Sequence, residues 1–139
     1  MDDCIFCKIV KGEISCSKIY EDDSTFSFLD INPVNPGHTL IIPKRHYANF
    51  LEIPEKELEN IIKTIKKIFP GILKSLNAPA SNIVQSNGKD AGQDIPHIHF
   101  HLIPRYKGDN REIKWKTEKI SSEDMQEIAN KIKRELSKP

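Results

Sequence analysis

Three histidines alternate with apolar residues in one short run, His97-Ile98-His99-Phe100-His101-Leu102-Ile103. Side chains of a β-strand point to opposite faces with a period of two. The alternation therefore predicts a strand with its imidazoles on one face and its apolar side chains on the other. Neighbours on one strand face lie roughly 6.5–7 Å apart, so the three rings can converge on one small target such as a metal ion or a phosphate. Because imidazole titrates near neutrality, each ring can act as a base, a nucleophile or a cation.

A single domain spanning residues 1–139 is the simplest arrangement for a chain of this length. Lys and Arg number 21 against 20 Asp and Glu, a balance that does not favour a nucleic-acid or membrane-surface binder. No apolar run approaches the roughly 20 residues of a membrane span, and the acidic start Met1-Asp2-Asp3 is unlike a signal peptide. We therefore expect a cytoplasmic protein. The odd number of cysteines also suits a reducing compartment.

Apolar periodicity and turn residues predict the order of the elements. We expect a short helix or turn at 4–10, then strands at 18–21, 24–30, 38–42 and 82–86, followed by the histidine strand. The helical pattern over 54–77 keeps its phase across Pro70-Gly71, which favours one kinked helix, with two separate helices as the alternative. Ser122 is expected to cap a last helix. Short connections between the strands favour an α+β fold, an antiparallel meander sheet with one long helix and short terminal helices.

Two kinds of chemistry compete for the histidine run. As ligands, alternating strand histidines can hold a divalent metal. As catalysts, one neutral imidazole attacks an electrophile while its neighbours orient it and carry charge. The preceding loop contains Asn87, Gly88, Gly92, Gln93 and Asp94, and glycine N–H groups together with amide side chains suit a bound phosphate. The alternative is an ordinary hairpin loop without a binding role. The position of this segment next to the histidines favours a loop that faces a phosphate.

The Cys4-x-x-Cys7 pair admits three interpretations, namely a redox pair, half of a metal site, or two buried cysteines. A zinc site needs two further ligands, and the candidates are His46 and one histidine of the alternating run. Spacing alone does not show that these residues meet. His38 begins an apolar strand and, by itself, is more typical of a strand edge than of a site.

Taken together, these segments resemble the histidine-triad (HIT) family, whose signature is His-x-His-x-His followed by two apolar positions. The resemblance covers nearly the whole chain from Cys4 to Arg105, and it is carried by residues 30–38 (DINPVNPGH), 43–46 (PKRH) and 87–105. The single-domain layout is most similar to the nucleotide-binding Hint branch. The resemblance implies a HIT domain with a core over about 4–105 and a helical extension over about 121–137. It also implies a homodimer, paired through the long helix and a sheet edge.

The family resemblance further implies nucleotidyl transfer at an α-phosphate. The implied substrates are purine nucleoside phosphoramidates, adenylylated amines or dinucleoside polyphosphates. His99 would attack phosphorus and form a nucleotidyl-histidine intermediate, with His101 and His38 beside the phosphoryl oxygens. The nucleotide contacts implied by the family pattern fall on Asp30, Ile31, Asn87, Gly92, Gln93, Asp94, Ile5, Phe6, Ile9 and Phe28.

Two positions distinguish this chain within the family pattern. Asp94 stands where several members carry a hydroxyl residue, and a carboxylate there either donates a proton, if its pKa is raised, or repels phosphate. The cysteine pair occurs in many prokaryotic members, which bind structural zinc through two cysteines and two histidines. We expect tetrahedral zinc here, because the matching residues are all present, namely Cys4, Cys7, His46 and His97.

Two other functions remain as alternatives. The first is a metal-dependent hydrolase with the three histidines as ligands, which is disfavoured because no obvious carboxylate partners accompany the run. The second is a non-enzymatic nucleotide-binding or scaffold protein, against which the intact triad argues.

Overall fold

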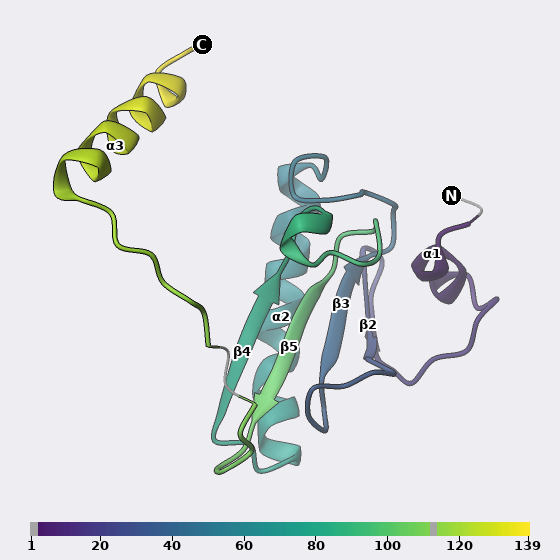
Figure 1. Ribbon diagram of the computed structural model, residues 1–139. Coiled ribbons are helices and arrows are strands. Elements are labelled where there is room, and N and C mark those ends of the chain that lie inside the picture. The colour runs from purple at the N-terminus through teal and green to yellow at the C-terminus, as the bar shows by residue number, and fades with distance from the viewer. Residues whose placement is uncertain (1–2, 112–113) are drawn as a thin grey trace.

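The computed structural model describes residues 3–111 and 114–139, and its elements are arranged as in Figure 1. The helices in this part of the chain are α1 (Ile5–Val10), α2 (Glu55–Ser75) and α3 (Ser122–Leu136), with a short 3-10 helix, η1 (Lys89–Ala91). The strands are β1 (Lys18–Glu21), β2 (Thr25–Leu29), β3 (Thr39–Pro43), β4 (Ala80–Gln85) and β5 (Phe100–Arg105). They pair antiparallel in the order β1-β2-β3-β5-β4. The predicted α+β class with an antiparallel sheet is confirmed, with β5 inserted between β3 and β4.

Helix α2 is continuous, as the unbroken apolar phase of the sequence predicted. Its buried positions recur at helical spacing and face the sheet, namely Ile61, Thr64, Ile65, Ile68 and Ile72. Pro70 lies inside the helix on its exposed side, where a missing backbone N–H is tolerated more easily because packing holds the opposite face. Glu55 and Glu57 in the first turn complement the helix dipole.

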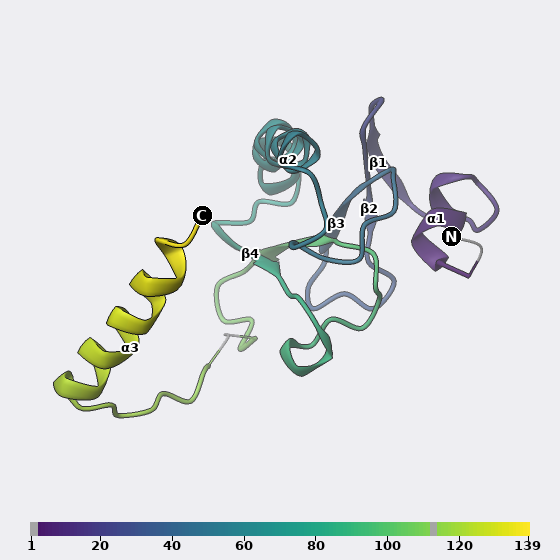
Figure 2. The ribbon, with the colours of Figure 1, turned by 90° about the horizontal axis from the view of Figure 1, so that it is seen from above.

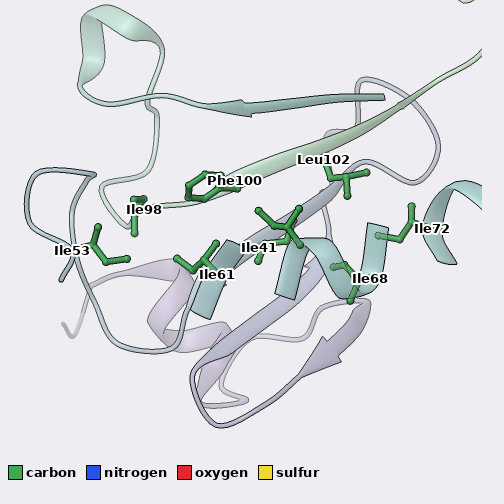
Figure 3. Close-up of a cluster of buried hydrophobic side chains, with 9 residues drawn as sticks. Ile41, Ile53, Ile61, Ile68, Ile72, Ile98, Phe100 and Leu102 are labelled. Atoms are coloured by element: carbon green, nitrogen blue, oxygen red, sulfur yellow. The ribbon is translucent and has the colours of Figure 1, made fainter. Parts of the chain in front are cut away.

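The sheet is covered on both faces, which explains why β2 and β3 are buried almost throughout. On the α2 face, Ile41, Phe100 and Leu102 pack with the apolar side of α2 (Figure 3). On the other face, β2 and β3 contribute a second cluster in which Phe6 of α1 meets Phe28, with ring centroids 5.6 Å apart. Figure 2 shows α2 along one face of the sheet and α1 next to β2. Side chains alternate between the two faces of each strand. One face therefore packs against α2, and the other carries the histidines.

The histidine run is only partly a strand, in contrast to the expectation of a continuous one. Strand β5 begins at Phe100, so His101 is the triad histidine inside it. The backbone N–H of Ile98 donates to the carbonyl of Tyr47 at 2.8 Å instead of entering the ladder with β3 or β4. The predicted two faces nevertheless persist, because Ile98 is buried in the α2 core while His97 contacts the ring of Phe6 on the other side.

The loop between β2 and β3 is anchored to the end of β5. Arg105 makes a bidentate ion pair with Asp109, at 2.9 and 2.7 Å, and Asn35 donates from its amide to Asp109 at 2.8 Å and to the carbonyl of Pro104 at 3.0 Å. This network fixes the loop that carries Asp30 relative to the histidine strand.

Helix α3 lies apart from the sheet in both ribbon views (Figures 1 and 2). Its N-cap is Ser121, whose side chain accepts from the N–H of Asp124, so the expected cap at Ser122 is wrong by one residue. No residue of α3 is buried. Among the described helices, none has the length and apolar character needed to cross a bilayer.

Candidate active site and metal cluster

A cavity of about 300 Å³ opens between α1, the β2–β3 side of the sheet and the histidine run. Its floor includes the rings of His99 and His101, whose centroids lie 5.0 Å apart. The remaining predicted nucleotide contacts that line it are Ile5, Phe6, Ile9, Phe28, Asp30, Ile31 and Asp94. The cavity thus combines an apolar end with a carboxylate and two imidazoles.

The proton of His99 can be assigned from its partner. Its Nδ1 lies 2.8 Å from the backbone carbonyl of His97, and a carbonyl only accepts, so Nδ1 carries the proton and donates. In the neutral tautomer with this proton, the lone pair is on Nε2. Nε2 lies 3.8 Å from a carboxylate oxygen of Asp94 at the cavity. In that tautomer a buried imidazole directs an unprotonated ring nitrogen toward the cavity, which is chemically suited to act as a nucleophile.

Val34, His38 and His101 form a chain of hydrogen bonds in which each group donates to the next. The backbone N–H of Val34 donates to Nδ1 of His38 at 3.0 Å, so the proton of His38 is on Nε2. That Nε2–H group donates to Nδ1 of His101 at 2.9 Å, which leaves the proton of His101 on its own Nε2. Asp30 lies 3.6 Å from Nε2 of His38. His38 is buried and contacts His101, whereas it does not line the cavity.

Burial keeps both of these rings neutral. Desolvation lowers the pKa of His38, against the opposing charge of Asp30. Desolvation, helped by the neighbouring rings of His99 and His38, lowers the pKa of His101 to about 4. At neutral pH the site therefore offers hydrogen-bond donors rather than imidazolium charges at these two positions.

The first triad histidine belongs to a different cluster. Cys4, Cys7, His46 and His97 place their potential ligand atoms within 4.8 Å of one another. Sγ of Cys4 lies 3.4 Å from Nδ1 of His97, and Sγ of Cys7 lies 3.5 Å from Nδ1 of His46 and 3.6 Å from Nδ1 of His97. Tetrahedral zinc with ordinary bond lengths separates sulfur and nitrogen ligands by roughly 3.6 Å. The spacing of these atoms thus fits a metal ion at the centre of the cluster.

The hydrogen bonds around the cluster agree with a metal-binding role. Nε2 of His97 donates to the carbonyl of Pro43 at 2.9 Å, so Nδ1 turns its lone pair toward the two sulfur atoms. Burial lowers the pKa of His97 to about 4, which keeps that lone pair free of a proton. Burial and the adjacent Cys4 raise the pKa of the Cys7 thiol, because two buried thiolates repel unless a cation joins them.

Three of the loop residues predicted to contact nucleotide lie outside the cavity lining. The amide of Asn87 accepts from the N–H of Phe50 at 2.8 Å, and the amide of Gln93 donates to the carbonyls of Ala48 and Ile95. Gly92, with φ of +90°, ends the 3-10 helix in a left-handed conformation. In this structure these three residues shape the loop and hold it against residues 48–50.

Sequence reasoning missed several residues of the cavity wall. The connection from α1 to β1 contributes Ile14, Ser15 and Cys16, and other segments contribute Asn32, Leu40 and Ile95. The α1–β1 connection has no periodic pattern, and only the packing of α1 against β2 brings it to the cavity. Leu40, by contrast, follows from the strand pattern, because it lies next to His101 in the β3–β5 register.

Comparison with known proteins identifies the family of the chain. The HIT domain model matches residues 11–108, and the chain therefore belongs to the HIT family. Over 130 residues it is 48% identical to an uncharacterised HIT-like protein of Methanocaldococcus jannaschii, a match that covers 94% of this chain and 98% of that one. Over 140 residues it is 40% identical to an adenosine 5'-monophosphoramidase of Candida albicans, covering 97% of this chain and 92% of the enzyme.

Solved structures show the same fold. A HIT family member from Bacillus subtilis superposes with a TM-score of 0.90 at 37% identity, covering 99% of both chains. A zinc-bound histidine triad protein from Mycobacterium smegmatis superposes with a TM-score of 0.76 at 34% identity, covering 84% of this chain and 85% of that one.

Proposed function

We propose that this protein is a nucleotide hydrolase or transferase that works through a nucleotidyl-His99 intermediate. Its substrates would be purine nucleoside phosphoramidates, adenylylated amines or dinucleoside polyphosphates, attacked at the α-phosphate. The observation that carries the proposal is the buried His99, whose Nδ1–H donates to a backbone carbonyl and leaves Nε2 for a substrate in a cavity that also holds Asp30 and an apolar end. The name of the Candida albicans relative, a monophosphoramidase, supports the same class of reaction.

Each part of the cavity matches one part of a nucleotide. The apolar end, with Phe6, Ile9 and Phe28, would take the flat face of a purine. Asp30 would accept hydrogen bonds from the ribose hydroxyls as a carboxylate. These contacts would bring the α-phosphorus to Nε2 of His99, and the Nε2–H of His101 would donate to a phosphoryl oxygen.

The reaction then runs in two displacements. In the first, Nε2 of His99 bonds to phosphorus while the bond from phosphorus to the leaving nitrogen or oxygen breaks. In the second, water attacks phosphorus, its proton passes to solvent, and the electron pair of the P–N bond returns to His99. A departing nitrogen takes its proton from water, because His38 and His101 each hold a single ring proton and its loss would leave an imidazolate.

His38 has a positioning role in this scheme. It fixes the tautomer of His101 by donating to Nδ1, so that the N–H of His101 faces the phosphate. Asn87, Gly92 and Gln93 hold the loop that carries Asp94 to the cavity.

We also propose that the metal cluster binds structural zinc through Cys4, Cys7, His46 and His97. Zinc would neutralise the two thiolates and hold the N-terminal segment to the histidine run. His97 connects this cluster to the chemistry, because its backbone carbonyl accepts the Nδ1–H of His99. For the assembly, we propose a cytoplasmic homodimer of a single-domain chain.

A metal-dependent hydrolase is less consistent with the geometry. His97 turns toward the cysteines, and His99 belongs to neither potential ligand group found in the described residues. The second such group, Asp30, His38 and His101, is compromised because Nδ1 of His38 accepts the N–H of Val34. A cation bound at Nε2 of His38 would therefore require an imidazolate or the loss of that hydrogen bond.

The test is to mix the protein with an adenosine phosphoramidate, quench in alkali and search for adenylylated His99 by mass spectrometry. We expect the adduct in the wild type, and turnover reduced about 10³-fold or more in His99→Ala. A chelator-treated sample reports whether a removable metal carries the chemistry. An undiminished rate in His99→Ala would refute the mechanism, and tight nucleotide binding without any turnover would favour the scaffold alternative.

A further inference from the structure

The cavity is lined by carboxylates but by no lysine or arginine in the described part of the chain. Asp30 and Asp94 supply its carboxylates. Of the two imidazoles beside them, His101 is neutral because burial lowers its pKa, and His99 is the proposed nucleophile. A substrate whose leaving group is a chain of phosphates would bring several further negative charges toward this wall without a fixed cation to compensate them.

Asp94 holds the exposed end of the cavity. Its side chain is 82% exposed, whereas the side chain of His99, 3.8 Å away, is only 5% exposed. The charge of Asp94 also reaches His101, whose pKa it raises slightly against the larger effect of burial. A carboxylate so placed lies beside the ring nitrogen that would bond to phosphorus.

The direction of the substrate follows from the opposite end. The buried side chains of Phe6, Ile9 and Phe28 form the closed apolar part of the lining, which suits a base. The substituent on the far side of the phosphorus must then point to the open end, past Asp94. This placement rests on the nucleotide-transfer function proposed above.

We propose that Asp94 is a specificity-determining residue that selects substrates by the charge of the leaving group. Amine leaving groups that carry a second, cationic group are favoured, and leaving groups that carry a carboxylate or further phosphates are disfavoured. Two charges about 6 Å apart at a solvated site change a rate constant severalfold, so exchanging a cation for an anion changes it by about tenfold.

The experiment uses adenosine phosphoramidates of three amines of similar length, namely ethylenediamine, ethanolamine and glycine. These leaving groups are cationic, neutral and anionic. The readout is kcat/KM for each, in the wild type, in Asp94→Asn and in Asp90→Asn. Asp90 is a matched control, because it is an exposed carboxylate of the same loop that does not line the cavity.

We expect the wild type and Asp90→Asn to prefer the cationic over the anionic amidate by about tenfold or more, and Asp94→Asn to lose most of that ratio. High salt should compress the wild-type ratio and leave that of Asp94→Asn nearly unchanged. An equal preference in the wild type and in Asp94→Asn, or no preference in the wild type, overturns the proposal.

A failure of the proposed function is separable from a failure of this inference. Turnover of the neutral ethanolamine amidate tests the reaction alone. If no amidate is cleaved, the affinities of the three amidates are measured by calorimetry, with His99→Ala and with the double variant that adds Asp94→Asn. If the preference for the cationic amidate disappears when Asp94→Asn is added, the result supports charge selection by Asp94. Equal affinities for the three amidates, or no binding, overturn that proposal.

Discussion

The protons of the site histidines are placed by their neighbours, one hydrogen bond at a time. His38 accepts the N–H of Val34 at Nδ1 and donates from Nε2 to Nδ1 of His101. His99 donates from Nδ1 to the carbonyl of His97. A sequence predicts that these rings share a side of the run, but it does not contain their tautomers. The tautomers of His38 and His99 depend on backbone groups close in the chain, the N–H of Val34 and the carbonyl of His97. That of His101 depends on His38, 63 residues away.

The buried ring of His101 makes stability depend on pH. Its pKa is about 4 in the folded protein against 6.5 when exposed, owing first to burial and then to His99 and His38, with Asp30 and Asp94 opposing. Between pH 4 and pH 6.5, His101 is protonated in the unfolded chain but remains neutral in the folded protein. The stabilisation is therefore complete above pH 6.5 and is lost as the pH falls to about 4.

We expect this effect to appear as a slope that His101→Asn removes. In urea titrations at a series of pH values, the free energy of unfolding of the wild type should fall by about 2 kcal/mol more than that of the variant between pH 6.5 and 4. The difference in slope is the readout, because the variant also changes absolute stability. Parallel curves for the two proteins would show that His101 titrates normally.

Among the elements, the strands and the long helix could be predicted from periodic patterns in the sequence. The residue at which the histidine run becomes a strand could not. The apolar phase of 54–77 predicted α2 as one helix. The run from His97 predicted a longer strand than β5, because alternation continues through an extended segment whose Ile98 N–H bonds to Tyr47 rather than to a strand. The insertion of β5 between β3 and β4 likewise depends on long-range packing.

The loop between β2 and β3 passes close to Leu76, the C-cap of α2, at Gly37. Gly37 has φ of +89°, and a Cβ atom there would clash with Leu76 and crowd Pro104. We expect Gly37→Ala to cost about 1–3 kcal/mol in urea unfolding, from the left-handed backbone and the crowding together. Gly71→Ala within α2 is the control, since an added Cβ meets nothing within 4 Å there, and it should be neutral or stabilising by up to about 1 kcal/mol. Equal effects of the two substitutions would contradict this assignment.

The metal cluster joins α1 to the histidine run, so its loss should be seen in stability as well as in activity. We expect about one zinc ion per chain by elemental analysis, and a chelator should lower the free energy of unfolding by about 4 kcal/mol where free zinc had been a thousandfold above its Kd. Cys7→Ser should behave like the chelated protein. Cys16→Ser lies outside the cluster and should keep its metal, and a metal-free wild type of unchanged stability would argue against the site.

At the scale of the whole molecule, apolar side chains remain exposed on β4, α2 and α3. Strand β4 is an edge strand, and its Ile83 is 50% exposed although it pairs with the buried Leu102 and so lies on the α2 face. Ile62 of α2 is 51% exposed, and α3 leaves the side chains of Met125, Ile128 and Ile132 in solvent. Uncovered edges and apolar faces of this kind are usually covered by a partner.

The proposed homodimer would cover that edge, and its mass provides the measurement. Sedimentation at low to high micromolar concentrations should report two 15.9 kDa chains. A charge placed in an apolar contact costs several kcal/mol, so Ile83→Lys should shift the protein toward one chain. Leu51→Lys makes the same change at a side chain that is 93% exposed on the connection before α2, and it should leave the mass unchanged. A wild type that sediments as a single chain at every concentration would refute the dimer, and a dimer insensitive to Ile83→Lys would place its interface elsewhere.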